Sequence, residues 1–200
     1  MATKPTTRAP AAAVAKRSRD ADATQRAILD AAVAAFARSG YDGASTREIA
    51  RDAGIDPRLI TRYFGSKERL FERAVEETYR HPLTMSPGHT RAAAEALLSD
   101  APLAQSQGLL LTLRSAANER AAEIMRGHLE THFQRQLADD LPGVEPVARA
   151  ALLISICAGV QLMRNVLGNR SLLAETTEVL VTRLTAALDA IAVAPSAETG

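Results

Sequence analysis

The sequence predicts an all-α protein, and three observations support that fold class. From Asp22 onward, apolar residues recur three and four positions apart, which is the spacing of one helix face. No stretch keeps the alternation of period two that a half-buried strand requires. Aromatic residues make up only 4% of the sequence and Trp is absent, so Ala, Leu, Val and Ile must fill the core.

The first long helix is expected to begin at Asp22, which can form a capping box with Gln25. Gly40 should end it, because glycine readily adopts the left-handed conformation that closes helices. Residues 1–20 are rich in Ala, Pro, Thr, Lys and Arg and cannot bury a core, so we expect a disordered basic tail. The inner face of the helix is the stripe Ile28, Leu29, Ala32 and Phe36.

A helix-turn-helix should follow. The second helix starts at Ser45, with Glu48 completing a capping box, and ends at Gly54. Asp56 can cap the third helix, and Pro57 suits its first turn, where no N–H donor is needed. Helix, glycine-containing turn and short helix together form this motif.

The third helix can last only to about Phe64, because Gly65 follows and Ser66 caps a fourth helix that runs to about residue 80. Ile60 and Phe64 should face inward. A short helix whose inner face is held by packing and whose outer face is cationic suits the major groove of DNA. Arginine is the side chain that most often recognises guanine there. The outward face carries Arg58, Leu59, Thr61 and Arg62.

The charge is unevenly divided along the chain. Residues 1–80 hold fifteen Lys or Arg and eleven Asp or Glu, a net charge of +4, whereas residues 81–200 hold nine and twelve, a net charge of −3. This division favours one region that meets a polyanion and one that does not.

Cysteine usage and hydropathy indicate a cytoplasmic protein. The single cysteine, Cys157, excludes an internal disulfide and is expected to be a buried, inert thiol. The longest apolar run, residues 150–160, is about half of the ~20 residues that span a bilayer, so no membrane partner is expected.

Residues 26–71, RAILDAAVAAFARSGYDGASTREIARDAGIDPRLITRYFGSKERLF, resemble the N-terminal domain of the TetR family of bacterial transcriptional regulators. The specific motifs are FARSGY (36–41), IARDAGI (49–55) and YFGSKE (63–68). Residues 113–133 resemble one C-terminal subgroup of the family. The resemblance implies a homodimeric, nucleoid-associated repressor that binds a palindromic DNA operator and is released by a small organic effector.

The resemblance also assigns DNA contacts by position. Many members have a small residue where Arg58 stands and an aromatic residue where Thr61 stands, so the base preference does not transfer. By position, Thr46 and Arg47 are implied to contact phosphate and sometimes a base. Pro57, Arg58 and Arg62 are implied to face bases, and Thr61, Tyr63 and Lys67 are implied to hold the DNA backbone.

Three features of the N-terminal region have alternative interpretations: Lys67, Leu59 and the basic tail. Lys67 lies in the first turn of a helix, where the macrodipole disfavours a cation, so either a phosphate docks there or the side chain faces water. Leu59 could touch a thymine methyl group or be half-buried. The basic tail could contact DNA beside the main site or remain a solvated leader.

We divide the chain into the tail (1–20), a helix-turn-helix DNA-binding domain (21–81), a helical ligand-binding and dimerisation domain (82–193) and a flexible C-terminus (194–200). The boundary lies near HPLTMSPGH, a loop with two prolines. Beyond it, helices are predicted over residues 87–99, 102–117, 119–138, 146–167 and 172–193.

The last two predicted helices indicate a homodimer. Residues 146–167 are apolar almost all round, and such a helix must be covered on every side. Two helices from each subunit would form a four-helix interface, and the twofold symmetry suits a palindrome. A helix central to a monomer core is the alternative. The last helix contributes the stripe Val179, Leu180, Leu184, Ala187, Leu188 and Ile191.

The helix over residues 119–138 predicts a ligand cavity. At 100° per residue, Met125, Leu129 and Phe133 share an apolar stripe, with His128 and His132 on its margin. We expect a medium-sized, largely apolar molecule with one anionic or hydrogen-bonding group for Arg114 or a histidine; an ordinary core is the alternative. The candidate ligand-binding residues are Leu110, Leu113, Arg114, Met125, His128, Leu129, His132, Phe133, Leu152 and Ile156.

The rival class is an enzyme or helical ligand-binding protein with an appended helix-turn-helix. His128 and His132 are four residues apart and could grip a metal, but Glu130 is misplaced for the zinc-protease motif and no third ligand is evident. The sequence has no glycine-rich phosphate loop, nucleophile elbow or cysteine cluster. We therefore expect no enzymatic activity, no cofactor and no metal.

Overall fold

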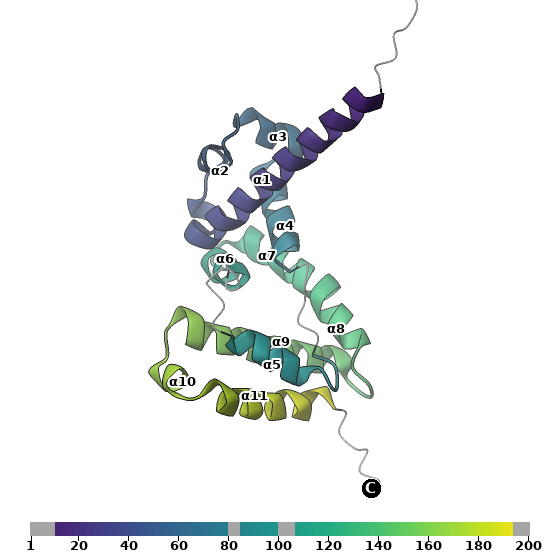
Figure 1. The fold of residues 1–200 in the computed structure, drawn as a ribbon, viewed down its shortest axis with the longest axis vertical. Helices are drawn as coiled ribbons and strands as arrows, with labels where there is room; N and C mark the ends of the chain where they lie inside the picture. The colour runs from purple at the N-terminus through teal and green to yellow at the C-terminus, as the bar shows by residue number, and fades with distance from the viewer. Residues whose placement is uncertain (1–10, 80–84, 100–106, 194–200) are drawn as a thin grey trace, which may run out of the picture.

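The computed structural model describes residues 11–79, 85–99 and 107–193 (Figure 1). Within these ranges every regular element is helical, which confirms the predicted fold class. The elements are α1 (Ala11–Gly43), α2 (Thr46–Asp52), α3 (Arg58–Phe64), α4 (Lys67–Thr78), α5 (Thr90–Leu98), α6 (Gln107–Ser115), α7 (Glu119–His128), the π-helical turn η2 (Leu129–Gln134), α8 (Arg135–Asp139), α9 (Pro146–Gln161), the π-helical turn η3 (Leu162–Val166), α10 (Arg170–Ala174) and α11 (Thr177–Ala192).

Helix α1 begins at Ala11, so the capping box predicted at Asp22 and Gln25 is wrong. Residues 11–20, which we assigned to a disordered tail, continue the helix away from the rest of the molecule (Figure 1). The Ala-rich composition of that stretch explains the extension, because Ala has the highest helix propensity. The predicted end is confirmed: Gly40 has a φ of 71° and breaks the helical backbone.

Local capping confirms the predicted starts of α2, α3, α4 and α7. In each case a side-chain oxygen before the helix accepts a hydrogen bond from a backbone N–H in the first turn. The glycines that end α2 and α3, Gly54 and Gly65, have φ values of 67° and 82°. The acceptor and donor pairs are Ser45 Oγ and Glu48 N (3.1 Å), Asp56 Oδ1 and Arg58 N (2.8 Å), Ser66 Oγ and Arg69 N (3.1 Å), and Asn118 Oδ1 and Ala121 N (2.9 Å).

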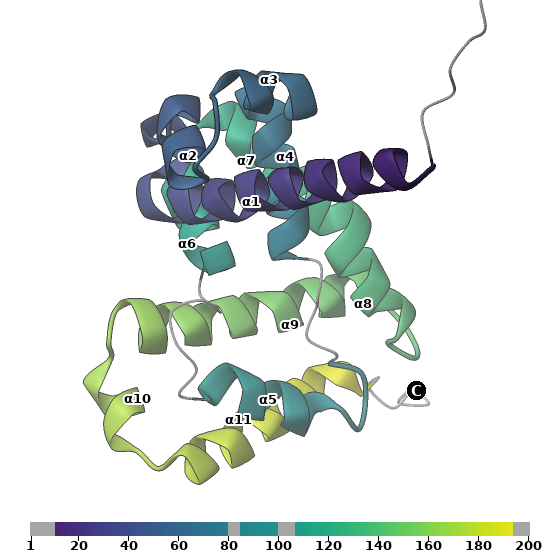
Figure 2. The ribbon, with the colours of Figure 1, turned by 45° about the horizontal axis from the view of Figure 1, so that its top comes forward.

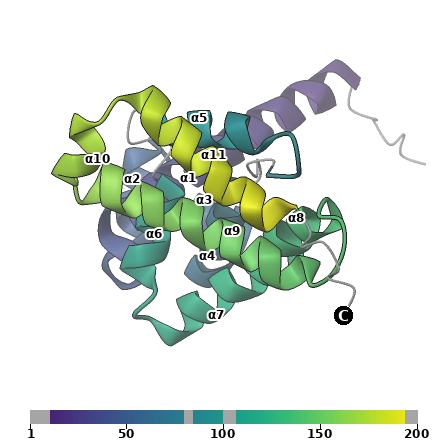
Figure 3. The same cartoon turned by 90° about the horizontal axis from the view of Figure 1, so that it is seen from below.

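The helices pack around two hydrophobic cores. The first core contains residues of the four helices α1, α2, α3 and α4 together with α6 and α7. Helices α6 and α7 belong to it because Leu111, Ala121 and Met125 are buried among the N-terminal residues. The second core joins α5, α8, α9 and α11. Figure 3 shows α9 and α11 running side by side, and Figure 2 shows α5 next to α11. Although α6 and α7 follow the proposed boundary near residues 81–89 in sequence, they pack on the N-terminal side.

The helix predicted over residues 119–138 is continuous but not regular. It passes from α7 through the π-helical turn η2 into α8. A π-helical turn holds more residues than an α-helical turn, so it rotates the side chains that follow it relative to an ideal helix. The final predicted helix is divided, because Glu175 and Thr176 separate α10 from α11.

The α9–η3 helix is apolar and sparsely covered. By length and composition alone, the helix Pro146–Val166 could cross a membrane. The apolar run of residues 150–160, considered in the sequence analysis, is only part of this apolar helix. Only 22% of the helix's most apolar stretch is buried in the protomer. Leu152 is 54% exposed and Met163 40% exposed. The described part of one chain therefore leaves an apolar helix face in need of a cover.

Arg149, at the start of α9, is a buried cation that holds the second core together. Its guanidinium donates hydrogen bonds to the carbonyl oxygens of Pro142, Val144, Ile191 and Ala192. These oxygens belong to the loop before α9 and to the C-terminal end of α11. A cation suits a helix C-terminus because the free carbonyls there carry the negative end of the macrodipole.

Candidate nucleic-acid interface and internal cavity

Helix α3 has the two faces that the sequence predicts. Ile60 is 1% exposed in the first core, and Phe64 packs partly against that core. Leu59 is half-buried, in accord with the second of the two alternatives for it. The other candidate contact residues also reach the surface: Arg47, Pro57, Arg58, Thr61 and Arg62 are exposed, and Thr46, Tyr63 and Lys67 are half-buried.

The exposed arginines of this surface have no acidic partner. Arg47, Arg58 and Arg62 form no ion pair with a carboxylate in the part of the chain that the structure describes. Arg38, by contrast, is bound by Glu48 at 2.6 Å and Asp52 at 3.2 Å. The guanidinium groups of Arg47, Arg58 and Arg62 therefore remain available to a polyanion.

Lys67 is held at the N-terminal end of α4. Its ammonium nitrogen lies 4.7 Å from the centroid of the Tyr41 ring, a cation–π contact. Ser66 caps the same helix end, and Arg62 lies 5.9 Å from the Tyr63 ring centroid. Lys67 thus stands beside the free N–H groups of a helix start, where an anion is stabilised by both the cation and the dipole.

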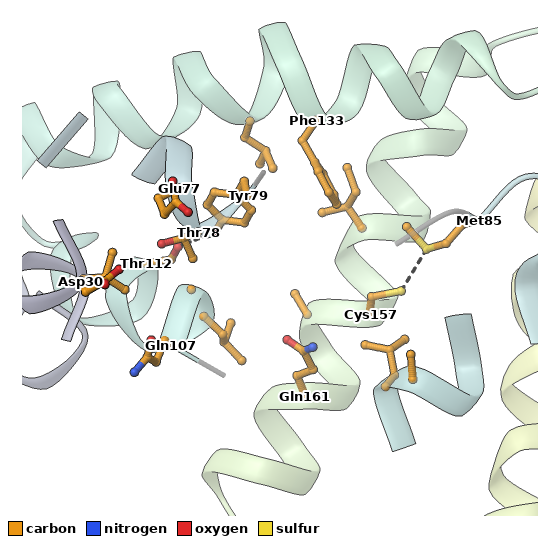
Figure 4. A pocket seen from close by; sticks show the side chains of 18 residues that line it. Asp30, Glu77, Thr78, Tyr79, Met85, Gln107, Thr112, Phe133, Cys157 and Gln161 are labelled. Atoms are coloured by element: carbon orange, nitrogen blue, oxygen red, sulfur yellow. Dashed lines mark hydrogen bonds between the residues drawn. The ribbon is translucent and has the colours of Figure 1, made fainter. Parts of the chain in front are cut away.

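A cavity of about 880 Å³ lies between the two cores (Figure 4). Its wall comes from α1 and α4 on one side, from α5 and α9 on the other, and from α6 and η2 between them. Tyr79 lines it, and its hydroxyl lies 2.7 Å from Thr112 Oγ1; burial, the larger effect, raises the pKa of Tyr79 and this hydrogen bond lowers it. The volume is typical of small-molecule sites.

Only two of the ten candidate ligand-binding residues line this cavity. They are Leu129 and Phe133, both in η2. The sequence argument took the apolar stripe of one helix and its neighbours as the cavity wall, whereas the wall is set by where α1, α4, α5, α6, α9 and η2 meet. The other eight lie elsewhere. Three belong to the cores: Met125 is buried in the first core, Leu110 packs against the first core, and Ile156 packs against the second. Leu113 and Leu152 are exposed, Arg114 binds a backbone carbonyl, and His128 and His132 line a separate surface hollow.

The His128 and His132 rings pack together with their centroids 4.7 Å apart and their planes tilted by 40°. Burial and then the neighbouring His132 lower the pKa of His128 below its ordinary value. Among the described residues, no group of three or more His, Cys, Asp or Glu side chains is arranged to hold a metal ion. The described residues therefore offer no third ligand for a metal ion bound by His128 and His132.

A contact that the sequence did not predict joins α1 to α6. Arg114 donates to the carbonyl of Ala37, and the backbone N–H of Tyr41 donates to Ser115 Oγ at 3.0 Å. Gly40 fits because a Cβ there would lie 2.3 Å from the Arg114 carbonyl oxygen. Next to this junction, Asn118 Nδ2 donates to Asp42 Oδ1 at 2.8 Å, and Arg120 on α7 pairs with Glu68 on α4 at 2.7 Å.

The cavity residues that sequence reasoning missed come from α1, α4, α5, α6 and α9. Asp30 and Glu77 lie in segments that we assigned to the DNA-binding domain, whereas Thr112 lies in the predicted helix over residues 102–117, where Leu110, Leu113 and Arg114 were expected instead. Hydropathy gave no signal for them, because a cavity between two cores is defined by how distant helices meet rather than by the pattern of any one of them.

The short capped α2, the glycine turn and the docked, cationic α3 define a helix-turn-helix protein of the DNA-binding class. Residues 28–74 match the family model described as bacterial regulatory proteins of the tetR family, and residues 88–191 match a model described as a tetracyclin repressor-like C-terminal domain. The chain therefore belongs to the TetR family of bacterial regulatory proteins.

Similar proteins include two repressors that match in the N-terminal region. The HTH-type transcriptional repressor NicS of Pseudomonas putida is 41% identical over 63 residues, covering 32% of this chain and 30% of NicS. The HTH-type transcriptional repressor SCO4008 of Streptomyces coelicolor is 43% identical over 60 residues, covering 30% of this chain and 31% of that protein. The chain thus spans about a third of the length of these curated relatives.

Solved structures match over most of the chain. A transcriptional regulator from Rhodococcus sp. Rha1 has 25% identity and a TM-score of 0.58, with 86% of this chain and 99% of that chain covered. A TetR-family regulator from Rhodococcus sp. has a TM-score of 0.68 with 19% identity, covering 86% and 99%. The second likeness shows that the fold is shared.

Proposed function

We propose that this chain is a ligand-responsive transcriptional repressor that binds a palindromic operator as a homodimer and is released by a small organic effector. The observation that carries the proposal is the α2–α3 surface, where Arg47, Arg58 and Arg62 are exposed and unpaired with carboxylates of the described residues. Both NicS and SCO4008 are named as repressors and match in this region.

The candidate DNA contacts divide into two kinds. Pro57, Arg58 and Arg62 face the bases, since they are exposed along one side of α3. The remaining candidates bind the sugar-phosphate backbone, with a base contact also open to Thr46 and Arg47: Thr46, Arg47, Thr61, Tyr63 and Lys67.

Selection of bound sequences from a random duplex pool tests the proposal. We expect a palindrome with half-sites about one helical turn or more apart, because a twofold dimer presents two copies of α3. Binding to that palindrome should weaken steeply with salt as counterions are released. Recovery of no enriched sequence, together with salt-independent binding, would contradict the proposal.

The homodimer interface is formed by α9, η3 and α11. Its exposed apolar residues, Leu152 and Met163, support this assignment. A charge at Leu152 should produce monomers in sedimentation experiments, whereas wild type should sediment as a dimer at micromolar concentration. Leu152 suits this test better than Ile154, which lines the cavity, or Leu184, which is only 9% exposed in the protomer.

The effector occupies the cavity between the two cores. Helix α6 supports a link from this cavity to the DNA-binding helices, since it lines the cavity with Gln107 and Thr112 and holds α1 through Arg114 and Ser115. Phe133→Ala should change the response to the effector while leaving DNA affinity without effector intact. If Phe133→Ala lost DNA binding and thermal stability together, Phe133 would be a core residue and not an effector contact.

A further inference from the structure

The basic side chains of α2, α3 and α4 fall into two groups. Arg51 pairs with Asp52 at 2.9 Å, and Arg73 pairs with Glu76. The second group forms no ion pair with a carboxylate of the described residues: Arg47, Arg58, Arg62, Lys67 and Arg69. Four of these are candidate DNA contacts, and the family resemblance assigns no role to the fifth, Arg69.

Arg69 lies in the first turn of α4, beside the end of α3. Its backbone N–H donates to Ser66 Oγ at 3.1 Å, and a Cβ added at Gly65, which ends α3, would lie 3.7 Å from Arg69 Cδ. Helical Cα–Cβ bonds tilt toward the N-terminus, so the exposed Arg69 side chain extends back toward the α3–α4 turn. This turn lies at the end of the molecule that carries α2 and α3, away from α9 and α11 (Figure 1).

The acidic residue next to Arg69 is engaged elsewhere. Glu68 Oε1 accepts hydrogen bonds from Arg120 of α7, from Nη2 at 2.7 Å and from Nε at 2.9 Å. Arg69 therefore keeps its guanidinium free of the carboxylate that is closest to it in the chain. A guanidinium that is exposed, unpaired and beside the helix that reads DNA is available to a phosphate group.

Lys67 and Arg69 point to different sides of α4. Two residues apart on an α-helix, they are separated by about 200° around its axis. The Lys67 ammonium lies over the Tyr41 ring, 4.7 Å from its centroid, whereas Arg69 lies on the outer side beside Gly65. The two cations therefore reach different places along a DNA strand that passes the start of α4.

We propose that Arg69 is a further contact to the DNA backbone and binds a phosphate group separate from the one that Lys67 binds. This inference rests on the proposed function, in which α3 enters the major groove. A phosphate contact carries no sequence information but fixes the position of the protein on the duplex. Arg69 thus extends the contacted backbone beyond the positions that the family resemblance implies.

Arg69→Gln tests the assignment. It keeps the backbone bond to Ser66 and breaks no ion pair with a carboxylate of the described residues, so thermal unfolding should match wild type. We expect it to weaken binding to the selected palindrome and to a random-sequence duplex alike, about fivefold at about 0.15 M salt, and to lower the salt slope by about one unit. Fluorescence anisotropy over a series of KCl concentrations measures both.

Two further variants locate the contact. Arg73→Gln is the matched control, because Arg73 lies one turn further along the same side of α4 and pairs with Glu76; it should leave affinity and salt slope unchanged. Lys67→Ala combined with Arg69→Gln should lower the salt slope by about two units, since the two side chains bind different phosphate groups.

Each contrary result has its own meaning. If wild type binds the palindrome and Arg69→Gln has the same affinity and salt slope, the inference is wrong and the proposed function stands. Relaxed preference at one base pair would make Arg69 a base contact and overturn the phosphate assignment. A double variant whose salt slope falls by only one unit would overturn the separate phosphate group. If wild type selects no palindrome and binds no duplex, the proposed function fails as well.

Discussion

The two hydrophobic cores are built from different side chains. In the first core, the Phe36 and Phe71 ring centroids lie 5.0 Å apart at 87°, and Tyr41 packs on Phe71 at 5.0 Å and 71°. The buried members of the second core, among the described residues, are aliphatic or contain sulfur. Edge-to-face rings have preferred geometries, whereas methionine and small aliphatic side chains tolerate rearrangement.

The contrast suits the proposed division of labour. Contacts to DNA bases need a surface held in one geometry, and the aromatic cluster lies directly beneath the helices that supply that surface. Met85, Leu97 and Cys157 belong to the second core and also line the cavity. Under the proposed function, the part of the molecule that would accommodate the effector is therefore the part whose packing adapts more easily.

The largest expected effect falls on the junction between the DNA-binding helices and α6. Gly40→Ala should lower the free energy of unfolding by about 4 kcal/mol or more, because the new Cβ would lie 2.3 Å from the Arg114 carbonyl oxygen and because the Gly40 backbone, with φ 71° and ψ 178°, is a conformation that glycine alone readily adopts. Urea denaturation measures the loss. Gly54→Ala is the control for a positive φ without a steric clash, since a φ of 67° costs an alanine about 1–2 kcal/mol and no neighbouring atom lies within 4 Å of the added Cβ. Equal losses would show that the junction yields to the added methyl group.

The next prediction concerns the second core. Arg149→Met should lower the free energy of unfolding by about 3 kcal/mol, because it leaves carbonyls of the 142–144 loop and of the α11 end without their donor. The control is Arg183→Met on the exposed side of α11, which should stay within about 0.5 kcal/mol of wild type. If Arg149→Met lowered the free energy of unfolding no more than Arg183→Met does, water would be replacing the guanidinium as hydrogen-bond donor to these carbonyls.

Substitutions on the DNA-binding surface should leave stability nearly unchanged and act on binding. Lys67→Ala should weaken binding to all duplexes alike and lower the salt slope by about one unit, whereas Arg62→Ala or Arg47→Ala should cost about 1–3 kcal/mol and relax preference at one base pair. Fluorescence anisotropy with operator and random duplexes separates the two outcomes. Arg73→Ala, on the far part of α4 and paired with Glu76, should match wild type. An unchanged affinity and salt slope for Lys67→Ala would remove the phosphate assignment.

The smallest effect concerns Cys157. Burial raises the pKa of its thiol to about 12, so the thiol stays protonated at pH 8 and should react slowly with a disulfide reagent until urea unfolds the chain. The raised pKa favours the folded state below the ordinary thiol pKa, and this contribution is lost as pH rises from there toward 12. Cys157→Ala should remove that part of the alkaline dependence. Rapid labelling of the folded protein at pH 8 would contradict the assignment.

The sequence by itself determined the N-terminal helices because their ends are set by neighbours in the chain. Ser45, Asp56 and Ser66 each cap a helix through a bond spanning two or three residues, and Gly40, Gly54 and Gly65 adopt the positive φ that ends one. The exposure of the α3 surface followed from the same local pattern. The exception is the start of α1, where the high helix propensity of the Ala-rich segment extended the helix past a plausible cap.

The tertiary structure decided the cavity and the junction. Leu129 and Phe133 were predicted, but Asp30, Glu77 and Thr112 reach the cavity only because α1, α4 and α6 meet there. Arg114 was expected to bind a polar group of the ligand, yet its partner is a carbonyl 77 positions earlier in the chain. Helix caps and turns are decided within a few bonds of the residues that form them. A cavity between two cores depends on packing between distant helices, which residue periodicity does not record.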